Sequence, residues 1–181
     1  ENKNKNAAAL WRSNPDGVGQ AIYHALGSLP VGKNKILVAP ESMFSFPLNE
    51  HPDLVHLWST VLQPDQHFLL GSVLKKQGKY YQAVFWLHVR LIKKVYVKKI
   101  LTPFVEKIPL SWKNYADLKG MFLHGFVEFE DSELTESAKF FDITSTVRIV
   151  PRICLEFFFT TRSDIDVVSA GNRAIVVFHF V

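Results

Sequence analysis

Three strand-length segments follow one another in the middle of the chain, with only short turns between them. Residues 67–74, 80–87 and 90–96 are rich in β-branched and aromatic side chains, which favour strands. A turn at 76–79, which contains a glycine, separates the first two segments. Strands joined by such short connections pair antiparallel, so we expect a hairpin or meander here. Any fold that this chain adopts has to contain that sheet.

Two amphipathic helices are expected before these strands. Residues 18–26 place apolar side chains at i, i+3, i+4, i+7 and i+8, after the start signal at 14–16 and before Gly27. Residues 52–62 also carry their apolar side chains on one side. The sequence therefore predicts helices on either side of residues 30–50.

A short apolar run, residues 35–39, lies between the two predicted helices. Continuous runs of this length are typical of buried strands. The run ends at Pro40 and Glu41. We therefore expect the Glu41 carboxylate where a central strand leaves the core, a position that catalytic groups often occupy in α/β proteins.

The second half of the chain has a weaker pattern. A helical turn is expected at 115–119 and an acidic loop at 128–136, and the strand candidates are 140–143, 144–149, 164–168 and 174–181. No repeat or low-complexity linker divides the sequence. The order of elements predicts a mixed α/β fold in a single domain spanning 1–181.

Composition excludes several classes of function. Hydrophobic residues make up 48% and charged residues 21% of the 181 residues, which is typical of a globular domain. The net charge is +4 and no basic run exceeds two residues, so we expect no nucleic-acid partner. No apolar run approaches the ~20 residues that span a bilayer. The seven histidines have no metal-ligand spacing, and we expect neither a metal nor another cofactor.

Cys154 is the only cysteine, and an extended apolar segment is expected to run up to it and past it to Phe159. A thiol has a pKa of about 8.5, so a thiolate nucleophile needs a general base and a nearby cation. Glu41 and one of the pair Lys98-Lys99, each at the end of a predicted strand, supply these groups. The backbone N–H of Leu155 is a candidate oxyanion donor. The alternative is that Cys154 is a small buried core residue.

Four local motifs carry a resemblance to a known superfamily. The run 38–42, V-A-P-E-S, resembles the P-E-[ST] glutamate motif of the carbon–nitrogen hydrolase (nitrilase) superfamily. Residues 96–109 resemble its lysine motif, in the version Y-x-K-x-x-L-x-P-F-G-E-x-x-P that is typical of apolipoprotein N-acyltransferases. Residues 153–156, I-C-L-E, are similar to I-C-Y-E, and residues 78–84 resemble the Y-Y-N strand before the lysine. The resemblance covers roughly residues 15 to 172.

The resemblance implies a role for each matching residue. Glu41 would be the general base, Lys98 rather than Lys99 the oxyanion stabiliser, and Cys154 the acylated nucleophile. Glu106 occupies the place of a second active-site glutamate, and Glu156 that of the carboxylate after the nucleophile. Each of these two carboxylates is equally well interpreted as a group that supports the active site or as a surface carboxylate. The implied fold is a nitrilase-like α-β-β-α sandwich, which we expect to be incomplete at both ends, as a fragment of a longer chain.

The implied activity is thioester-forming acyl transfer or amide hydrolysis. The donor would be a phospholipid or an amide, and the acceptor a lipoprotein amine or water. Membrane association through missing segments, homo-oligomerisation and, by analogy, the periplasmic face of a bacterial inner membrane are compatible with it.

The sequence also departs from the motifs. Val105 replaces the glycine of P-F-G-E, Gln82 the asparagine of Y-Y-N, and Leu155 the tyrosine of C-Y-E. Conjugal-transfer proteins of the TraB type carry similar motifs that diverge further. A nitrilase-like binding or assembly module with weak or no catalysis is therefore the alternative to an enzyme.

Overall fold

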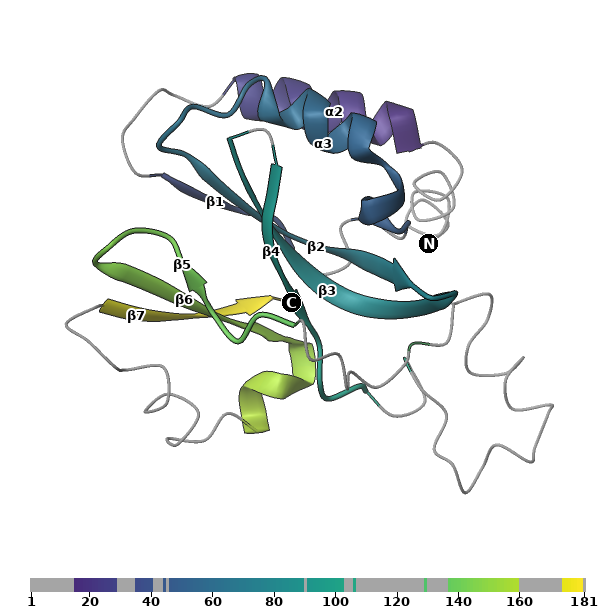
Figure 1. Ribbon diagram of the computed structural model, residues 1–181, viewed down its shortest axis with the longest axis vertical. Coiled ribbons are helices and arrows are strands. Elements are labelled where there is room, and N and C mark those ends of the chain that lie inside the picture. The colour runs from purple at the N-terminus through teal and green to yellow at the C-terminus, as the bar shows by residue number, and fades with distance from the viewer. Residues whose placement is uncertain are drawn as a thin grey trace, which may run out of the picture.

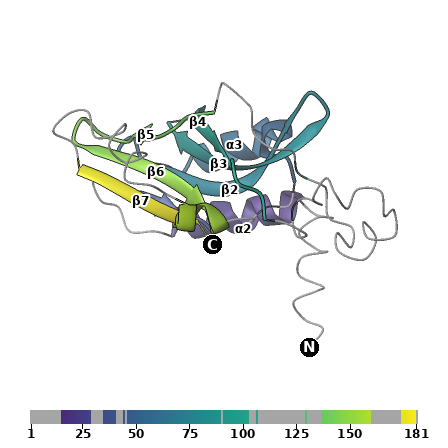
Figure 2. The same cartoon turned by 90° about the horizontal axis from the view of Figure 1, so that it is seen from below.

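The computed structural model describes residues 15–28, 35–40, 44, 46–89, 91–102, 106, 129, 137–159 and 174–180. These residues form two sheets and a helical layer (Figures 1 and 2). Helices α2 (Pro15–Gly27) and α3 (Pro52–Ser59) cover one face of the first sheet, and the second sheet covers the other. Among the residues described, no helix is long and apolar enough to span a membrane.

The first sheet has the order β1-β2-β3-β4, and its last three strands are the predicted meander. They are β2 (His67–Lys76), β3 (Lys79–His88) and β4 (Leu91–Val97), paired antiparallel. The tight turn from β2 to β3 holds Gln77 at φ 53° and Gly78 at φ 75°. Two successive positive φ angles match the right-handed twist of a hairpin, which explains the glycine at this turn.

Strand β1 (Ile36–Val38) pairs parallel with β2 and lies at the edge of the described sheet. The prediction of a buried central strand at 35–39 was therefore wrong in its placement. Val38 is 42% exposed, and Ile36 and Leu37 are only half-buried. A short apolar run gives no information on whether a strand has neighbours on both sides, and only the tertiary structure settles this.

The helices pack on the first sheet through an apolar layer that includes Ile22, Leu54 and Trp58. Helix α2 approaches α3 closely at Gly19, where a Cβ atom would lie 2.4 Å from Cδ2 of Leu54. The Gly19 carbonyl accepts a hydrogen bond from Nε1 of Trp58 at 2.9 Å. The small residue and the bond together fix how the two helices cross. A short 3-10 helix, η1 (Leu48–Glu50), precedes α3.

The second sheet has the order β5-β6-β7. Strand β6 (Val147–Ile153) pairs antiparallel with β5 (Phe141–Asp142) and parallel with β7 (Ala174–Phe180). Buried side chains of both sheets form one apolar cluster between them: Leu69, Val84, Trp86, Tyr96, Phe141, Ile143, Ile149 and Ile153. The expected nitrilase-like α/β architecture is thus confirmed in its helical layer and its two facing sheets.

Two predictions in the second half need correction. The strand expected at 144–149 runs instead from Val147 to Ile153, after a turn in which Thr144 accepts hydrogen bonds from the backbone N–H groups of Thr146 and Val147. The chain is not extended past Cys154, because residues Cys154–Phe159 form the 3-10 helix η3. The elements expected at 115–119 and 164–168 lie outside the described residues, as does all of 128–136 except Phe129.

Candidate active site

The ends of β4 and β6 are joined by one carboxylate, that of Glu156. Its Oε2 atom accepts hydrogen bonds from the Tyr96 hydroxyl at 2.8 Å and the Ile153 N–H at 3.0 Å. Its Oε1 atom accepts bonds from the backbone N–H groups of Lys99 at 2.5 Å and Ile100 at 3.2 Å. Glu156 is buried, and several N–H and O–H donors are what a buried carboxylate requires. The chain after β4 is therefore fixed against the turn that holds Cys154.

Tyr96 remains a hydrogen-bond donor in this arrangement. Burial raises the pKa of its phenol, and the neighbouring Glu156 carboxylate raises it further, while Arg152 acts in the opposite direction. A phenol that keeps its proton donates to Glu156 at every physiological pH. The hydrogen bond from Tyr96 in β4 to Glu156 in η3 is therefore not lost through deprotonation of the phenol at physiological pH.

Lys98 directly follows β4 and is 1% exposed. Its Nζ lies 2.7 Å from Oε1 of Glu106, whose side chain is also buried. The other carboxylate oxygen, Oε2, accepts the backbone N–H of Thr102 at 2.6 Å, and the Glu106 N–H donates to the Thr102 carbonyl at 3.0 Å. A buried ion pair of this kind costs desolvation energy, and its role need not be stability.

Cys154 stands at the corner between β6 and η3, and its φ is +49°. A left-handed conformation is uncommon outside glycine and stores strain of about 1–3 kcal/mol. The side chain is half-buried at the border of the cluster between the sheets. Cys154 is thus neither fully buried nor exposed, and both its role as nucleophile and the alternative of a structural thiol stay predictions.

The structure places the predicted site residues as follows. Lys98 and Glu106 form one buried pair, and Glu156 links the Lys98 segment to the Cys154 corner. Leu155 lies within η3, where its backbone N–H follows the cysteine. Glu41, the expected general base, lies outside the described residues. Its role, like the triad as a whole, stays a prediction.

Described residues on either side of Glu41 contact β2. Ala39 N–H donates to the Leu69 carbonyl at 2.8 Å, and Pro47 forms an isolated parallel bridge with Val73. The chain therefore meets β2 both before and after residue 41.

No group of three potential metal ligands occurs in the part of the chain that the structure describes.

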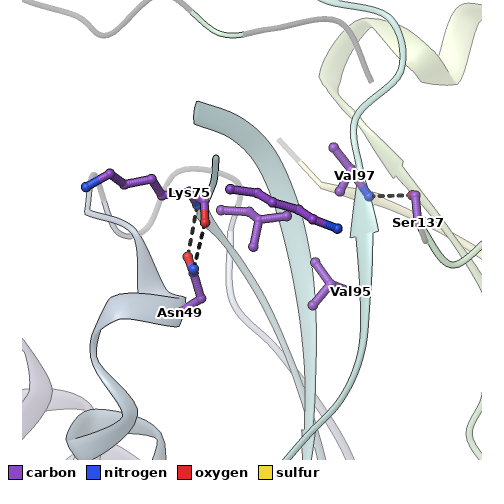
Figure 3. A pocket seen from close by; sticks show the side chains of 7 residues that line it. Asn49, Lys75, Val95, Val97 and Ser137 are labelled. Carbon is purple, nitrogen blue, oxygen red and sulfur yellow. Dashed lines mark hydrogen bonds between the residues drawn. The ribbon is translucent and has the colours of Figure 1, made fainter. Parts of the chain in front are cut away.

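A pocket lies on the helix-facing side of the first sheet (Figure 3). This pocket of about 320 Å³ is lined by Asn49, Leu74, Lys75, Lys76, Val95, Val97 and Ser137. Asn49 bonds both backbone groups of Lys75, and Ser137 accepts the Val97 N–H. The lining residues that the structure describes include none of Lys98, Glu106, Cys154 and Glu156.

No protein-family model matches the sequence, and no curated protein is found similar to it. A glutamine-dependent NAD+ synthetase from Acinetobacter baumannii, solved with adenosine diphosphate, aligns with a TM-score of 0.57 and 15% identity over 91% of this chain. A glutamine-dependent NAD(+) synthetase from Cytophaga hutchinsonii aligns over 80% with a TM-score of 0.44 and 16% identity. A CN-hydrolase superfamily protein from Xanthomonas campestris, with an arsenic adduct in its active site, aligns over 81% with a TM-score of 0.46 and 16% identity.

These alignments cover 29%, 25% and 50% of the three solved chains. At such identities the likeness concerns the fold. The helical layer and two facing sheets are the features of the fold that the alignment with the Acinetobacter baumannii structure covers. What the chain does with this fold depends on the site itself.

Proposed function

We propose that this chain catalyses acyl transfer through a thioester on Cys154, with Lys98 as the oxyanion stabiliser and Glu41 as the general base. The observation that carries the proposal is the connection made by Glu156. It fixes the segment of a fully buried lysine to the corner that presents a half-buried thiol. A core that serves only stability does not require an ammonium and a thiol at one edge of the two sheets. Acyl transfer through a thioester requires both groups.

The first half-reaction transfers the acyl group to sulfur. The Cys154 thiol gives its proton to the Glu41 carboxylate, and the thiolate attacks the acyl carbonyl. The new C–S bond places negative charge on the carbonyl oxygen, where the Lys98 ammonium and the Leu155 N–H stabilise it. Collapse breaks the bond to the leaving oxygen or nitrogen, which takes the proton from Glu41. The acyl-enzyme and the protonated leaving group result.

The second half-reaction releases the acyl group. An amine or water gives a proton to Glu41 and attacks the thioester carbonyl, the C–S bond breaks, and the Cys154 sulfur recovers its proton. Glu106 holds the Lys98 ammonium through both steps. Following the motif version of residues 96–109, we propose a lipoprotein amine as acceptor and a phospholipid as donor, and an amide hydrolase is the nearest variant of the same chemistry.

Cys154 is the only thiol, so covalent labelling can be assigned without ambiguity. The protein is incubated with a p-nitrophenyl ester of a short fatty acid, and the intact mass is measured before and after neutral hydroxylamine. We expect one acyl adduct that hydroxylamine removes, because thioesters react with it and amides do not. Cys154→Ser and Cys154→Ala should lose this adduct while keeping the parental circular dichroism spectrum.

The binding or assembly module is the other outcome of the same experiment. A parent protein that acquires no hydroxylamine-sensitive adduct, or a Cys154→Ala variant labelled as fast as the parent, contradicts the proposed enzyme. The replacements Val105 and Leu155, which depart from the motifs, would then be read as marks of a scaffold that has lost turnover.

A further inference from the structure

Strand β2 is buried along most of its length and loses its cover at its end. Residues 67–73 are buried, whereas Leu74, Lys75 and Lys76 are only half-buried. The pocket of Figure 3 lies at this end of the strand. Leu74, Val95 and Val97 line the pocket and belong to the apolar layer that faces the helices. Because Leu74 and Val95 are half-buried, the pocket offers apolar surface to a ligand.

Hydrogen bonds hold both sides of the pocket. On one side, Asn49 of η1 donates to the Lys75 carbonyl at 2.8 Å and accepts the Lys75 N–H at 2.9 Å. On the other side, Ser137 accepts the Val97 N–H at 2.9 Å (Figure 3). Side chains that are already held in place lose little conformational entropy when a ligand binds. The pocket is thus formed before any ligand enters it.

Positive charge is concentrated at the β2–β3 hairpin beside the pocket. Lys75 and Lys76 line the pocket, Lys79 begins β3, and the ladder places Lys76 directly opposite Lys79. Residues that are opposite in an antiparallel pair project to the same face, where like charges lower the stability of the sheet. The same arrangement attracts an anion.

One oxyanion is already bound at this end of the sheet. The exposed Glu50 carboxylate lies 2.9 Å from Nζ of Lys75. Glu50 is not among the described lining residues, which include two ammonium groups and no carboxylate. The charge that lines the described part of the pocket is therefore positive.

An apolar wall next to ammonium groups suits a ligand that is aliphatic at one end and anionic at the other. The pocket, of about 320 Å³, is at the lower end of the range of about 300–1,000 Å³ that is typical of ligand sites, so the ligand has to be small. Short-chain fatty carboxylates and alkyl phosphates share this chemistry.

We propose that this pocket binds a small anion with an aliphatic chain. The chain contacts Leu74 and Val95, and the charged end lies beside the ammonium groups of Lys75 and Lys76. The described lining residues include none of those assigned to acyl transfer, and the pocket would bind its ligand whether or not Cys154 forms a thioester.

The test is isothermal titration calorimetry of the full chain with four probes, each below its micelle concentration. Octanoate and octyl phosphate carry the same chain on two different anions, 1-octanol has the chain without the charge, and acetate has the charge without the chain. We expect octanoate or octyl phosphate to bind at one site, more tightly than 1-octanol and acetate and less tightly at high salt. The tighter of the two anions identifies the ligand as a carboxylate or a phosphate.

Three variants locate the binding site. Lys76→Gln removes one lining charge, and Val95→Thr keeps the shape of the side chain while replacing a methyl group by a hydroxyl. We expect octanoate and octyl phosphate to bind about fivefold more weakly to the first and about threefold more weakly to the second. Lys93→Gln is the matched control and should bind like the parent, because it makes the same change in net charge at an exposed lysine of β4 outside the described lining.

Circular dichroism shows whether each variant is folded. If Val95→Thr does not fold, Lys76→Gln decides, since its side chain is half-buried at the end of a strand. The inference is overturned if neither octanoate nor octyl phosphate binds, if 1-octanol binds as tightly as both, or if Lys76→Gln binds them as tightly as Lys93→Gln.

Discussion

The two faces of the first sheet are buried in different ways. Toward α2 and α3 the core is apolar, and its polar atoms bond to backbone carbonyls, as Trp58 Nε1 does to Gly19 and Ser72 Oγ to Phe46. Toward the second sheet, ionisable side chains are buried at both ends, His67 at one and Lys98 at the other. A stable core needs only the first arrangement, since buried ionisable groups oppose folding.

The groups that hold the fold together and the groups suited to chemistry therefore lie on opposite faces of the first sheet. The helix-facing layer holds the sheet together by apolar contact. The face between the sheets contains groups whose burial has to be compensated by specific partners, Glu106 for Lys98 and four donors for Glu156. Substitutions on the two faces should therefore differ in size and in cause.

The largest effect is expected for Lys98→Met. Removing the ammonium leaves the Glu106 carboxylate buried without its partner, which costs about 3–5 kcal/mol in the free energy of unfolding. Urea denaturation measures it. Lys75→Met, which removes a solvated ammonium paired with Glu50, should change little. The double variant Lys98→Met/Glu106→Gln should recover most of the loss, and a double variant as unstable as the single one would show that the pairing is not the cause.

Glu156→Gln is expected to have the next largest effect, a loss of about 3 kcal/mol in the free energy of unfolding. An amide would present N–H groups to some of the donors that the carboxylate accepts, among them the four described here. Tyr96→Phe removes one donor only and should cost about 1 kcal/mol. Guanidinium denaturation measures the free energy of unfolding of each variant and shows which loss is larger. Equal losses would mean that the phenol, and not the backbone N–H groups, carries the connection.

On the helix-facing side, Gly19→Ala should cost about 0.5–1.5 kcal/mol, since the new Cβ would clash with Leu54 Cδ2 and the buried Leu54 side chain would have to leave its rotamer. Gly27→Ala is the matched control, because its Cβ would meet only Val61 Cγ1 at an ordinary 3.8 Å. Thermal unfolding compares the two. A Gly19→Ala variant that melts with the parent would show that the helix contact is loose.

A further effect, which develops only on acidification, is a pH dependence from His67. Burial and the neighbouring His88 lower the pKa of its imidazole to about 4, while Asp65 acts weakly the other way. Its Nδ1 accepts the Trp86 indole N–H at 3.2 Å, which requires the neutral ring. Between pH 6.5 and about 4 the unfolded chain binds the proton and the folded chain does not, so stability falls on acidification by up to about 1.4 kcal/mol per pH unit.

This dependence is measured as the urea midpoint from pH 7 to 4. His67→Leu should flatten the acid side of the curve, and His56→Leu, at an exposed position on α3, should leave it unchanged. If His67→Leu keeps the parental slope, another group is responsible for the acid sensitivity.

Much of the fold could be predicted from periodicity. The stripe at 18–26 gave a helix that runs from Pro15 to Gly27, because its pattern reflects burial on one face. The block at 67–96 gave the meander, because strands covered on both faces are rich in β-branched and aromatic residues. The edge position of β1 could not be predicted, since a strand of three residues has the same sequence signal with one neighbour or two. The change from strand to 3-10 helix at Cys154 was also missed, because residues 154–159 are mostly apolar, with three successive phenylalanines that favour extension.

The candidate site, too, could be predicted only in part from the sequence. The chain alone identified Lys98, Glu106, Cys154 and Glu156 by short motifs, and the pairing of Glu41 with them stays a prediction. It gave no role to Tyr96, whose hydroxyl donates a hydrogen bond to Glu156 in the structure.

The sequence by itself determined which segments become helices and strands and which residue types stand at their ends, because these depend on neighbours a few positions away. Only the tertiary structure decided that one carboxylate would join the ends of β4 and β6 and that a buried lysine would be paired with a glutamate. Such contacts depend on how two sheets stack, and stacking is set by the fit of side chains from distant parts of the chain.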